Sequence, residues 1–252
     1  AAGGHNLLLI GRPGTGKSMI AKAIPGILPD LTLDEAMEVT KIHSVAGLLS
    51  DGLVKSRPFR SPHHTASSVA LMGGGAKVMP GEISLAHKGV LFLDELPEFS
   101  RNVREALRQP MEDKVISIAR ANSKLDFPAD FMLVASMNPC PCGYFGADDN
   151  KCTCTPRQIA NYLGRISGPF LDRIDLQIEM NNVSFDEISD VKKGESSEKI
   201  KKRVDIARQR QIERYKAVGI TNNACLRSSM IDEYCNISVA CKGFLKNIYS
   251  KL

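Results

Sequence analysis

The chain has 252 residues, of which 43% are hydrophobic and 24% are charged, and its formal net charge is +5. These values are ordinary for a globular protein, and the absence of any run of about 20 apolar residues excludes a membrane-spanning helix. The seven cysteines argue against a secreted disulfide scaffold, because their number is odd and four are crowded together, and they favour the cytoplasm. The mild positive charge fits nucleic-acid binding and simple solubility equally well.

A phosphate-binding loop is predicted close to the N-terminus. Its eight residues fit the pattern G-x-x-x-x-G-K-[ST] and are Gly11, Arg12, Pro13, Gly14, Thr15, Gly16, Lys17 and Ser18. An apolar run precedes the loop and a helical run follows it, which is the context that the motif requires. In such a loop backbone N–H groups surround phosphate oxygens, the lysine reaches the β- and γ-phosphates, and the serine can bind Mg²⁺. We therefore expect ATP and Mg²⁺ here rather than a glycine-rich turn that binds nothing.

Four short apolar runs predict the strands of a parallel sheet, and they are 7–10, 90–93, 131–135 and 175–178. The first three are continuously apolar, as expected for strands with helices on both faces. Helical spacing over 100–111 supports an α/β core with three layers. From about residue 182 the chain becomes basic and helical, with a helix predicted to start near Ser196 and shorter ones at 228–234 and 239–252. We expect an α/β core at 1–181 and a partial helical lid at 182–252.

Two carboxylates, Asp94 and Glu95, follow the strand predicted at 90–93. Ligands of open α/β sheets bind at the carboxyl ends of the strands. There Asp94 can hold Mg²⁺ through its water shell, and Glu95 can polarise an attacking water. Many strands end in acids, so this assignment depends on the pairing with the glycine loop.

Two further polar residues are candidates for the site: Asn138, after the strand predicted at 131–135, and Arg173, before the strand predicted at 175–178. Asn138 could orient the water or touch the γ-phosphate, or it could cap the turn before Pro139. Arg173 could stabilise the charge that develops during γ-phosphate transfer, acting in a neighbouring subunit. Alternatively, Arg173 could form a surface ion pair with Asp172 or Asp175.

Four cysteines form two C-x-C pairs separated by nine residues, and they are Cys140, Cys142, Cys152 and Cys154. Four thiolates can surround a tetrahedral Zn²⁺, although zinc pairs are usually spaced C-x₂₋₄-C. The alternative is four reduced surface thiols. If zinc is bound, we expect its removal to leave nucleotide binding intact, because the cysteines and the glycine loop share no ligands.

The glycine loop, Asp94-Glu95, Asn138 and Arg173 occur in the order found in AAA+ ATPases, which the chain resembles. Three longer runs, Phe59 to Thr65, Gly81 to Gly89 and Gly164 to Arg173, are similar to the magnesium-chelatase-like branch, and within it to bacterial proteins of the ComM/YifB type. The resemblance covers nearly the whole chain. It implies a hexameric, ring-forming ATPase that acts on branched DNA.

The resemblance also assigns roles to individual residues. Walker A corresponds to Gly11–Ser18, Walker B to Val90–Glu95, sensor 1 to Asn138 and the arginine finger to Arg173. The family's Lon-protease-like N-terminal domain and its sensor 2 arginine are not among these 252 residues, so we expect a piece of a longer protein.

Two insertions are expected between the motifs. The long gap between Lys17 and Asp94 fits an insertion in the second helix, with a flexible turn at Gly73–Gly75. A hairpin is predicted over Lys114 to Phe127, around a turn at Asn122-Ser123. In related helicases such hairpins face the pore, so its basic residues, Lys114, Arg120 and Lys124, are candidates for phosphate contact, while an ordinary charged hairpin remains as good an interpretation.

Three functions therefore compete. The first is an ATP-driven motor on DNA, and the second is the motor subunit of a magnesium-chelatase-type complex that remodels a protein partner. The third is a nucleotide-dependent assembly scaffold, which the complete set of Lys17, Asp94, Glu95 and Arg173 disfavours.

Overall fold

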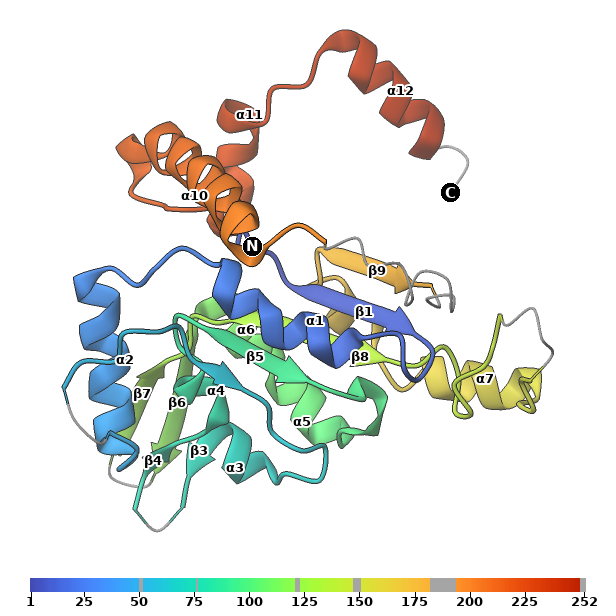
Figure 1. Cartoon of the computed structure of the whole chain (residues 1–252), viewed down its shortest axis with the longest axis horizontal. Helices are drawn as coiled ribbons and strands as arrows, with labels where there is room; N and C mark the ends of the chain where they lie inside the picture. The colour runs from blue at the N-terminus through green and yellow to red at the C-terminus, as the bar shows by residue number, and fades with distance from the viewer. Residues whose placement is uncertain (50–51, 76, 121–122, 147–150, 182–193, 250–252) are drawn as a thin grey trace.

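A five-stranded sheet in the order β2-β5-β8-β1-β9 forms the centre of the molecule, seen here in a computed structural model (Figure 1). The structure describes residues 1–49, 52–75, 77–120, 123–146, 151–181 and 194–249. The strands are β1 (Leu7–Gly11), β2 (Phe59–Arg60), β5 (Val90–Leu93), β8 (Met132–Met137) and β9 (Leu176–Met180). Every pairing between neighbours is parallel, so the carboxyl ends of the strands lie along one edge. All four predicted strands are present, and the short edge strand β2 is an addition.

Both faces of the sheet are buried at β5 and β8, whereas the edge strand β9 is largely exposed, and this arrangement confirms the predicted three-layer α/β fold. Alternate side chains of each strand point to opposite faces. On one face Leu91 and Leu133 pack into a core with residues of α5 and the segments around it, such as Val103 and Leu107. On the other face Phe92 and its neighbours pack against Ala21, Ile24 and Leu28, which lie on or just after the first helix.

The helices of the core follow the strands in sequence. They are α1 (Lys17–Ala23), α2 (Leu33–Val45), α3 (Ser68–Met72), α4 (Glu82–Leu85), α5 (Arg101–Ala106), α6 (Arg108–Asp113), α7 (Pro156–Leu163) and α8 (Gly168–Leu171), with 3₁₀ turns at Ile24–Ile27 and Leu96–Glu98. The single helix predicted over 100–111 is two helices, because Pro110 lacks an N–H and its ring clashes with the carbonyl group four residues earlier. That residue is Ala106, where α5 ends.

Two antiparallel hairpins leave the core. The first pairs β3 (Gly73–Gly74) with β4 (Met79–Pro80), so Gly73 and Gly74 form a strand where the sequence predicted a turn. A side chain at Gly73 would lie 2.5 Å from the carbonyl oxygen of Met79, and its φ of 91° also favours glycine. The second pairs β6 (Val115–Arg120) with β7 (Ser123–Pro128) and confirms the hairpin predicted over 114–127. The middle of its turn, 121–122, lies outside the described residues.

The C-terminal region is helical, as predicted. It contains α10 (Ser197–Arg214), α11 (Ile231–Tyr234) and α12 (Val239–Tyr249), with 3₁₀ turns at Lys216–Val218, Asn223–Cys225 and Ser228–Met230. Ser196 caps α10, where the sequence placed its start. Residues 182–193 lie outside the described part, so the boundary between residues 181 and 182 stays a prediction.

The α10 helix lies against the start of the chain (Figure 1). Its Arg208 Nε and Gln211 Nε2 donate to the carbonyl oxygen of Ala2, at 2.8 and 3.1 Å. Lys201 Nζ also donates to Asp30 Oδ1 at 2.5 Å. Among the described helices, none has the length and apolar character needed to cross a membrane.

Candidate nucleotide site

The phosphate-binding loop connects β1 to α1 at the carboxyl edge of the sheet. Gly14 and Gly16 have φ angles of 82° and 83°, in the left-handed region that favours glycine. A side chain at Gly11 would lie 2.9 Å from the carbonyl oxygen of Met180 on β9. Helix α1 begins at Lys17, and no side chain caps it. The first N–H groups of a helix have no partner within that helix, so this loop is suited to an anion.

Lys17 is buried and its ammonium group binds three oxygen atoms. Nζ donates to the carbonyl oxygens of Gly11 at 2.6 Å and Arg12 at 2.7 Å, and to Oδ1 of Asn138 at 3.2 Å. Burial lowers the pKa of Lys17, and the negative charges of Asp94 and Glu95 partly oppose that shift. The lysine is thus held inside the loop, next to a residue from the neighbouring strand β8.

The side chains of Ser18, on α1, and Asp94, directly after β5, contact each other. Ser18 Oγ donates to Asp94 Oδ2 at 2.9 Å. The other carboxylate oxygen of Asp94 accepts a hydrogen bond from the hydroxyl group of Ser136 on β8. A hydroxyl group and a carboxylate are hard oxygen donors, which is the ligand type that Mg²⁺ prefers, so the residues present fit this ion.

Glu95 follows Asp94 in a left-handed backbone conformation, with a φ of 55°. Its N–H group faces Ser136 Oγ at 3.3 Å and Asp94 Oδ1 at 3.2 Å. Its side chain is 53% exposed, and Oε2 lies 3.4 Å from Nδ1 of His64. Glu95 is therefore turned out of the strand into the space beside the loop, where His64 touches it.

Asn138 is held from two sides. Its side chain accepts from Lys17, and its backbone is hydrogen-bonded to the hydroxyl group of Tyr162 on α7. Burial raises the pKa of Tyr162 to about 12, so this hydroxyl group stays protonated at neutral pH. The contact with Lys17 places Asn138 at the phosphate loop, as its predicted function requires.

Arg173 lies at the opposite end of the sheet from the phosphate loop. Its carbonyl oxygen accepts from Asn6, directly before β1, at 2.9 Å. Its guanidinium group contacts Glu112 on α6 and the carbonyl oxygen of Pro169, not Asp172 or Asp175. Its Nε is buried without a hydrogen-bond partner in the described part of the chain. The structure therefore does not bring Arg173 to the nucleotide site of its own chain.

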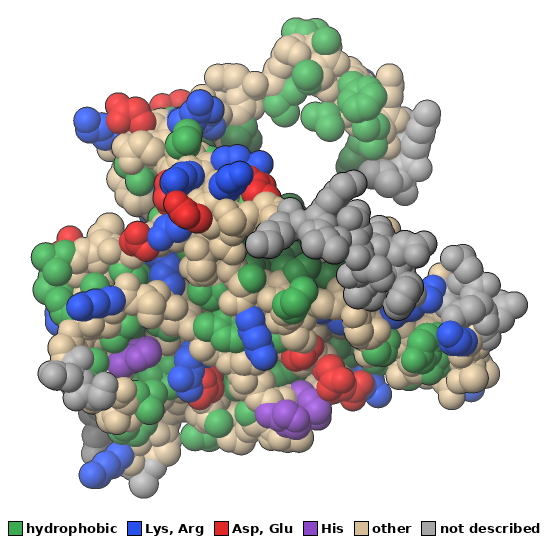
Figure 2. Space-filling model, viewed as in Figure 1, with side chains coloured by type: hydrophobic (Ala, Val, Ile, Leu, Met, Phe, Trp, Pro, Cys, Tyr) green, Lys and Arg blue, Asp and Glu red, His purple; other side chains and the backbone are tan. Residues whose placement is uncertain are grey.

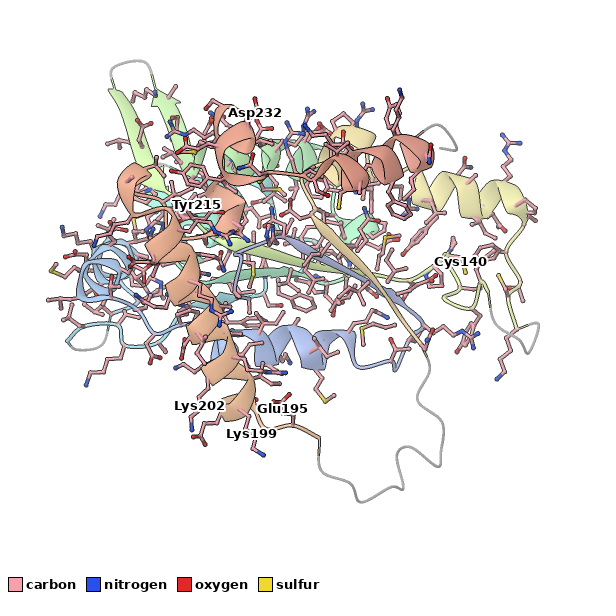
Figure 3. The ribbon with its side chains drawn as sticks, turned by 90° about the horizontal axis from the view of Figure 1, so that it is seen from above. Cys140, Glu195, Lys199, Lys202, Tyr215 and Asp232 are labelled. Atoms are coloured by element: carbon pink, nitrogen blue, oxygen red, sulfur yellow. The ribbon has the colours of Figure 1, made fainter. Side chains whose placement is uncertain are left out.

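The four-cysteine cluster follows Asn138 and converges as predicted. Its four Sγ atoms all lie within 4.8 Å of one another. Figure 3 labels Cys140 in the loop between the end of the sheet and α7. The loop residues 147–150 lie outside the described part, and all seven cysteines of the chain are free thiols.

Several basic residues of the hairpin and of α10 lie close to acids of the same chain. Lys114 lies 3.8 Å from Asp130, and Lys124 lies 3.7 Å from Asp126. The side chain of Arg120 lies outside the described part. Cations gather over α10 in Figure 2, but Lys202 pairs with Glu198 at 3.0 Å, and in Figure 3 it lies beside Lys199. Neither element presents a free row of cations among these residues.

Sequence reasoning missed three polar partners of the site: Ser136, His64 and Tyr162. The first has a signal, because Ser136 and Asn138 are two residues apart along the strand and so face the same side. His64 and Tyr162 reach the site from segments whose packing the sequence pattern does not define.

Comparisons with known proteins agree with this geometry. Residues 1–188 match the family model described as magnesium chelatase, subunit ChlI, and residues 194–252 match that of the ChlI C-terminal region. The chain is 51% identical to Uncharacterized protein YifB of Escherichia coli over 239 residues, or 94% of this chain and 46% of that protein. It is 47% identical to Competence protein ComM of Haemophilus influenzae over 254 residues, or 100% of this chain and 49% of that protein.

A more distant relative is DNA replication licensing factor mcm6 of Dictyostelium discoideum. It is 28% identical over 174 residues, which is 69% of this chain and 17% of that protein. The chain spans about half the length of YifB and ComM. Its parallel sheet, covered on both faces and followed by helices, is that of a P-loop AAA+ core. The chain belongs to the magnesium chelatase subunit ChlI family.

Proposed function

We propose that this chain is the ATPase module of a ring-forming AAA+ motor that hydrolyses ATP with Mg²⁺ and acts on branched DNA. The observation that carries the proposal is the meeting of Lys17, Ser18 and Asp94 at one sheet edge. Two side-chain hydrogen bonds join the start of α1 to the residues that follow β5 and β8, from Ser18 to Asp94 and from Lys17 to Asn138. A site for a nucleoside triphosphate and its Mg²⁺ needs a buried cation for the phosphates and hard oxygen ligands for the metal ion at the same place.

Each residue has one task in this proposal. The loop 11–18 binds the phosphates, and Lys17 exchanges its carbonyl partners for β- and γ-phosphate oxygens. Asn138 orients the attacking water beside the γ-phosphate. Ser18 and Asp94 would hold Mg²⁺, which when bound neutralises the charge that develops on the phosphate oxygens. Glu95 accepts a proton from the attacking water, and its exposed, turned-out carboxylate supports this assignment.

Arg173 is proposed to act in the neighbouring subunit of a hexameric ring. Its place at the amino end of β1 puts it beyond the site of its own chain. In the separate chain its charge is neutralised by Glu112, so assembly must replace that partner by a phosphate. The unpartnered Nε supports the idea that another acceptor arrives.

DNA as the partner rests on the similarity to ComM and mcm6, whose names refer to competence and to DNA replication licensing. The family description, magnesium chelatase, favours the second candidate, a motor that remodels a protein partner. A nucleotide-dependent scaffold remains the third candidate, and the hydrogen-bonded Ser18–Asp94 pair speaks against it.

The free thiols fit the reducing cytoplasm. Zinc at the four cysteines would be a structural ion, separate from the Mg²⁺ of the reaction.

The deciding experiment is an ATPase assay of the full-length protein with no DNA and with single-stranded, duplex and branched DNA. Stimulation that is strongest with branched DNA and lost in Glu95→Gln supports the DNA motor. ATP hydrolysis that no DNA changes would favour the protein-remodelling motor, and nucleotide binding without hydrolysis would favour the scaffold.

A further inference from the structure

The sulfur–sulfur distances within the cysteine cluster are close to those of a tetrahedral metal site. Cys140 Sγ lies 3.3 Å from Cys142 Sγ and 3.8 Å from Cys152 Sγ, and the sulfur atoms of Cys142 and Cys152 are 3.7 Å apart. In a regular tetrahedron with Zn–S bonds of about 2.3 Å the sulfur atoms are about 3.8 Å apart. Cys154 completes the group, since all four sulfur atoms lie within 4.8 Å of one another.

The local backbone explains how two tight C-x-C pairs converge. The N–H group of Gly143 donates to the carbonyl oxygen of Cys140 at 3.0 Å and closes a turn with Pro141 at its second position. That turn brings Cys140 and Cys142 together. Burial alternates along residues 151–155, where Cys152 and Cys154 are less exposed than the residues beside them, so these two cysteines face the same side.

A backbone donor beside the cluster favours a thiolate at Cys140. The N–H group of Phe145 points at Cys140 Sγ, 3.3 Å away. A backbone donor directed at sulfur stabilises the thiolate, which is the form that binds metal. Cys140 is buried, so a charge there needs a cation.

The cluster touches the phosphate loop at two points. A side chain at Gly143 would lie 2.8 Å from Cδ of Pro13, so the backbone of Gly143 packs directly against the Pro13 ring. Arg12 Nη2 donates to the carbonyl oxygen of Gly146 at 3.2 Å. Moreover, Asn138, which binds Lys17, precedes Cys140 by only two residues. These contacts support an effect of the metal on nucleotide binding, in place of the expectation that its removal leaves binding intact.

We propose that Cys140, Cys142, Cys152 and Cys154 bind one structural Zn²⁺, and that the bound ion braces the phosphate loop through Gly143 and Gly146. Soft thiolate ligands in a tetrahedral set select zinc or iron over Mg²⁺. Without the metal, four thiols and a polar loop have little apolar area to fix them, so Gly143 and Gly146 lose their defined positions. The part that concerns nucleotide rests on the proposed function, whereas the metal site does not.

The metal site is tested by elemental analysis of the reduced, full-length protein, purified without a histidine tag or chelator. About one zinc per chain is expected for a closed site with four ligands. The double variant Cys142→Ser/Cys152→Ser should lose it, while the control Cys235→Ser/Cys241→Ser, at two exposed cysteines, should keep it. Four freely titratable thiols without metal, a Cys140–Cys142 disulfide, or iron with visible absorption would each overturn the zinc assignment.

The coupling is tested by the affinity of zinc-loaded and zinc-depleted protein for a fluorescent ATP analogue, with circular dichroism to confirm that the depleted protein is folded. Depletion should weaken binding by about tenfold, the effect of losing one charged hydrogen bond, here the bond from Arg12 to Gly146 that helps to hold the phosphate loop. Re-addition of zinc should restore the affinity. Unchanged affinity after depletion would overturn the bracing while leaving the metal site. Failure of the zinc-loaded protein to bind nucleotide would instead contradict the proposed function.

A second variant keeps the bracing testable if the depleted protein unfolds. Gly143→Ala leaves all four thiols in place but puts a methyl group against Pro13, at a φ of 86°. It should retain zinc and still bind the ATP analogue more weakly. Gly219→Ala is a matched control, because Gly219 has a φ of 72° and a side chain there meets no atom within 4 Å. Full affinity in Gly143→Ala would count against the bracing.

Discussion

Ser18 Oγ and Asp94 Oδ2 are 2.9 Å apart, although 76 residues separate them in the chain. The hydroxyl group belongs to the first turn of α1 and the carboxylate to the end of β5. This contact joins the phosphate loop to the acidic strand, and we propose that Mg²⁺ binds at this pair.

Replacement of Asp94 by asparagine should uncouple ATP binding from Mg²⁺. The amide keeps the shape of the side chain but removes the negative charge that attracts the ion. In the parent, Mg²⁺ should tighten the binding of an ATP analogue, and in Asp94→Asn this effect should largely disappear. Titrations with Mg²⁺ or with EDTA measure it, and Asp232→Asn, at an exposed acid of α11, is the control. An equal Mg²⁺ effect in parent and variant would remove Asp94 from the metal site.

Replacement of Lys17 by alanine should weaken ATP binding by roughly 100-fold, because charged hydrogen bonds contribute about 1.5–3 kcal/mol and this residue supplies more than one. Lys22→Ala, an exposed lysine on the same helix, should bind normally. Equilibrium binding of a fluorescent analogue compares the two. Normal affinity in Lys17→Ala, with a normal circular dichroism spectrum, is incompatible with our site.

Replacement of Glu95 by glutamine should leave ATP binding intact and slow hydrolysis by about 10²–10⁴-fold, the usual contribution of a general base. The amide cannot accept the proton of the attacking water. Glu98→Gln, three residues later, is the control and should retain turnover, since its ion pair with Arg165 is exposed. If Glu95→Gln turned over at the parent rate, another residue would have to activate the water.

Replacement of Arg173 by alanine should preserve nucleotide binding and lower turnover only in the assembled protein. Mixing it with Glu95→Gln should recover part of the activity, since mixed rings contain interfaces in which both residues are intact. Subunit mixing is verified by two different affinity tags. Co-assembly without any recovery would show that Arg173 does not act across an interface.

Much of the fold follows from the sequence because its signals are local. Continuous apolar runs predicted three strands, a weaker run predicted the fourth, and Ser196 marked the start of α10. The two-residue strand β2 has no such signal, since it exists only by pairing with β5. Pro110 ends α5 at Ala106, although the helical spacing of apolar residues over 100–111 continues past this break.

Sequence motifs predicted the residues of the candidate site, but they did not predict which side chains contact one another. The order of Lys17, Asp94 and Asn138 indicated a shared edge, and their hydrogen bonds bear out that proximity. The pairing of Arg173 with Glu112 depends on how α6 packs beside residues far along the chain, so spacing favoured the wrong acids. The contact of Gly143 with Pro13 likewise requires the three-dimensional path of the loop after β8.

The structure of full-length Glu95→Gln with ATP and Mg²⁺ tests the central claim most directly. Our account predicts the triphosphate in the loop 11–18, with Lys17 Nζ moved from the carbonyl oxygens of Gly11 and Arg12 to the β- and γ-phosphates. It also predicts Mg²⁺ beside Ser18 and Asp94, and Asn138 facing the γ-phosphate. Nucleotide bound elsewhere, or a Lys17 that keeps its carbonyl partners while ATP is bound, would contradict it.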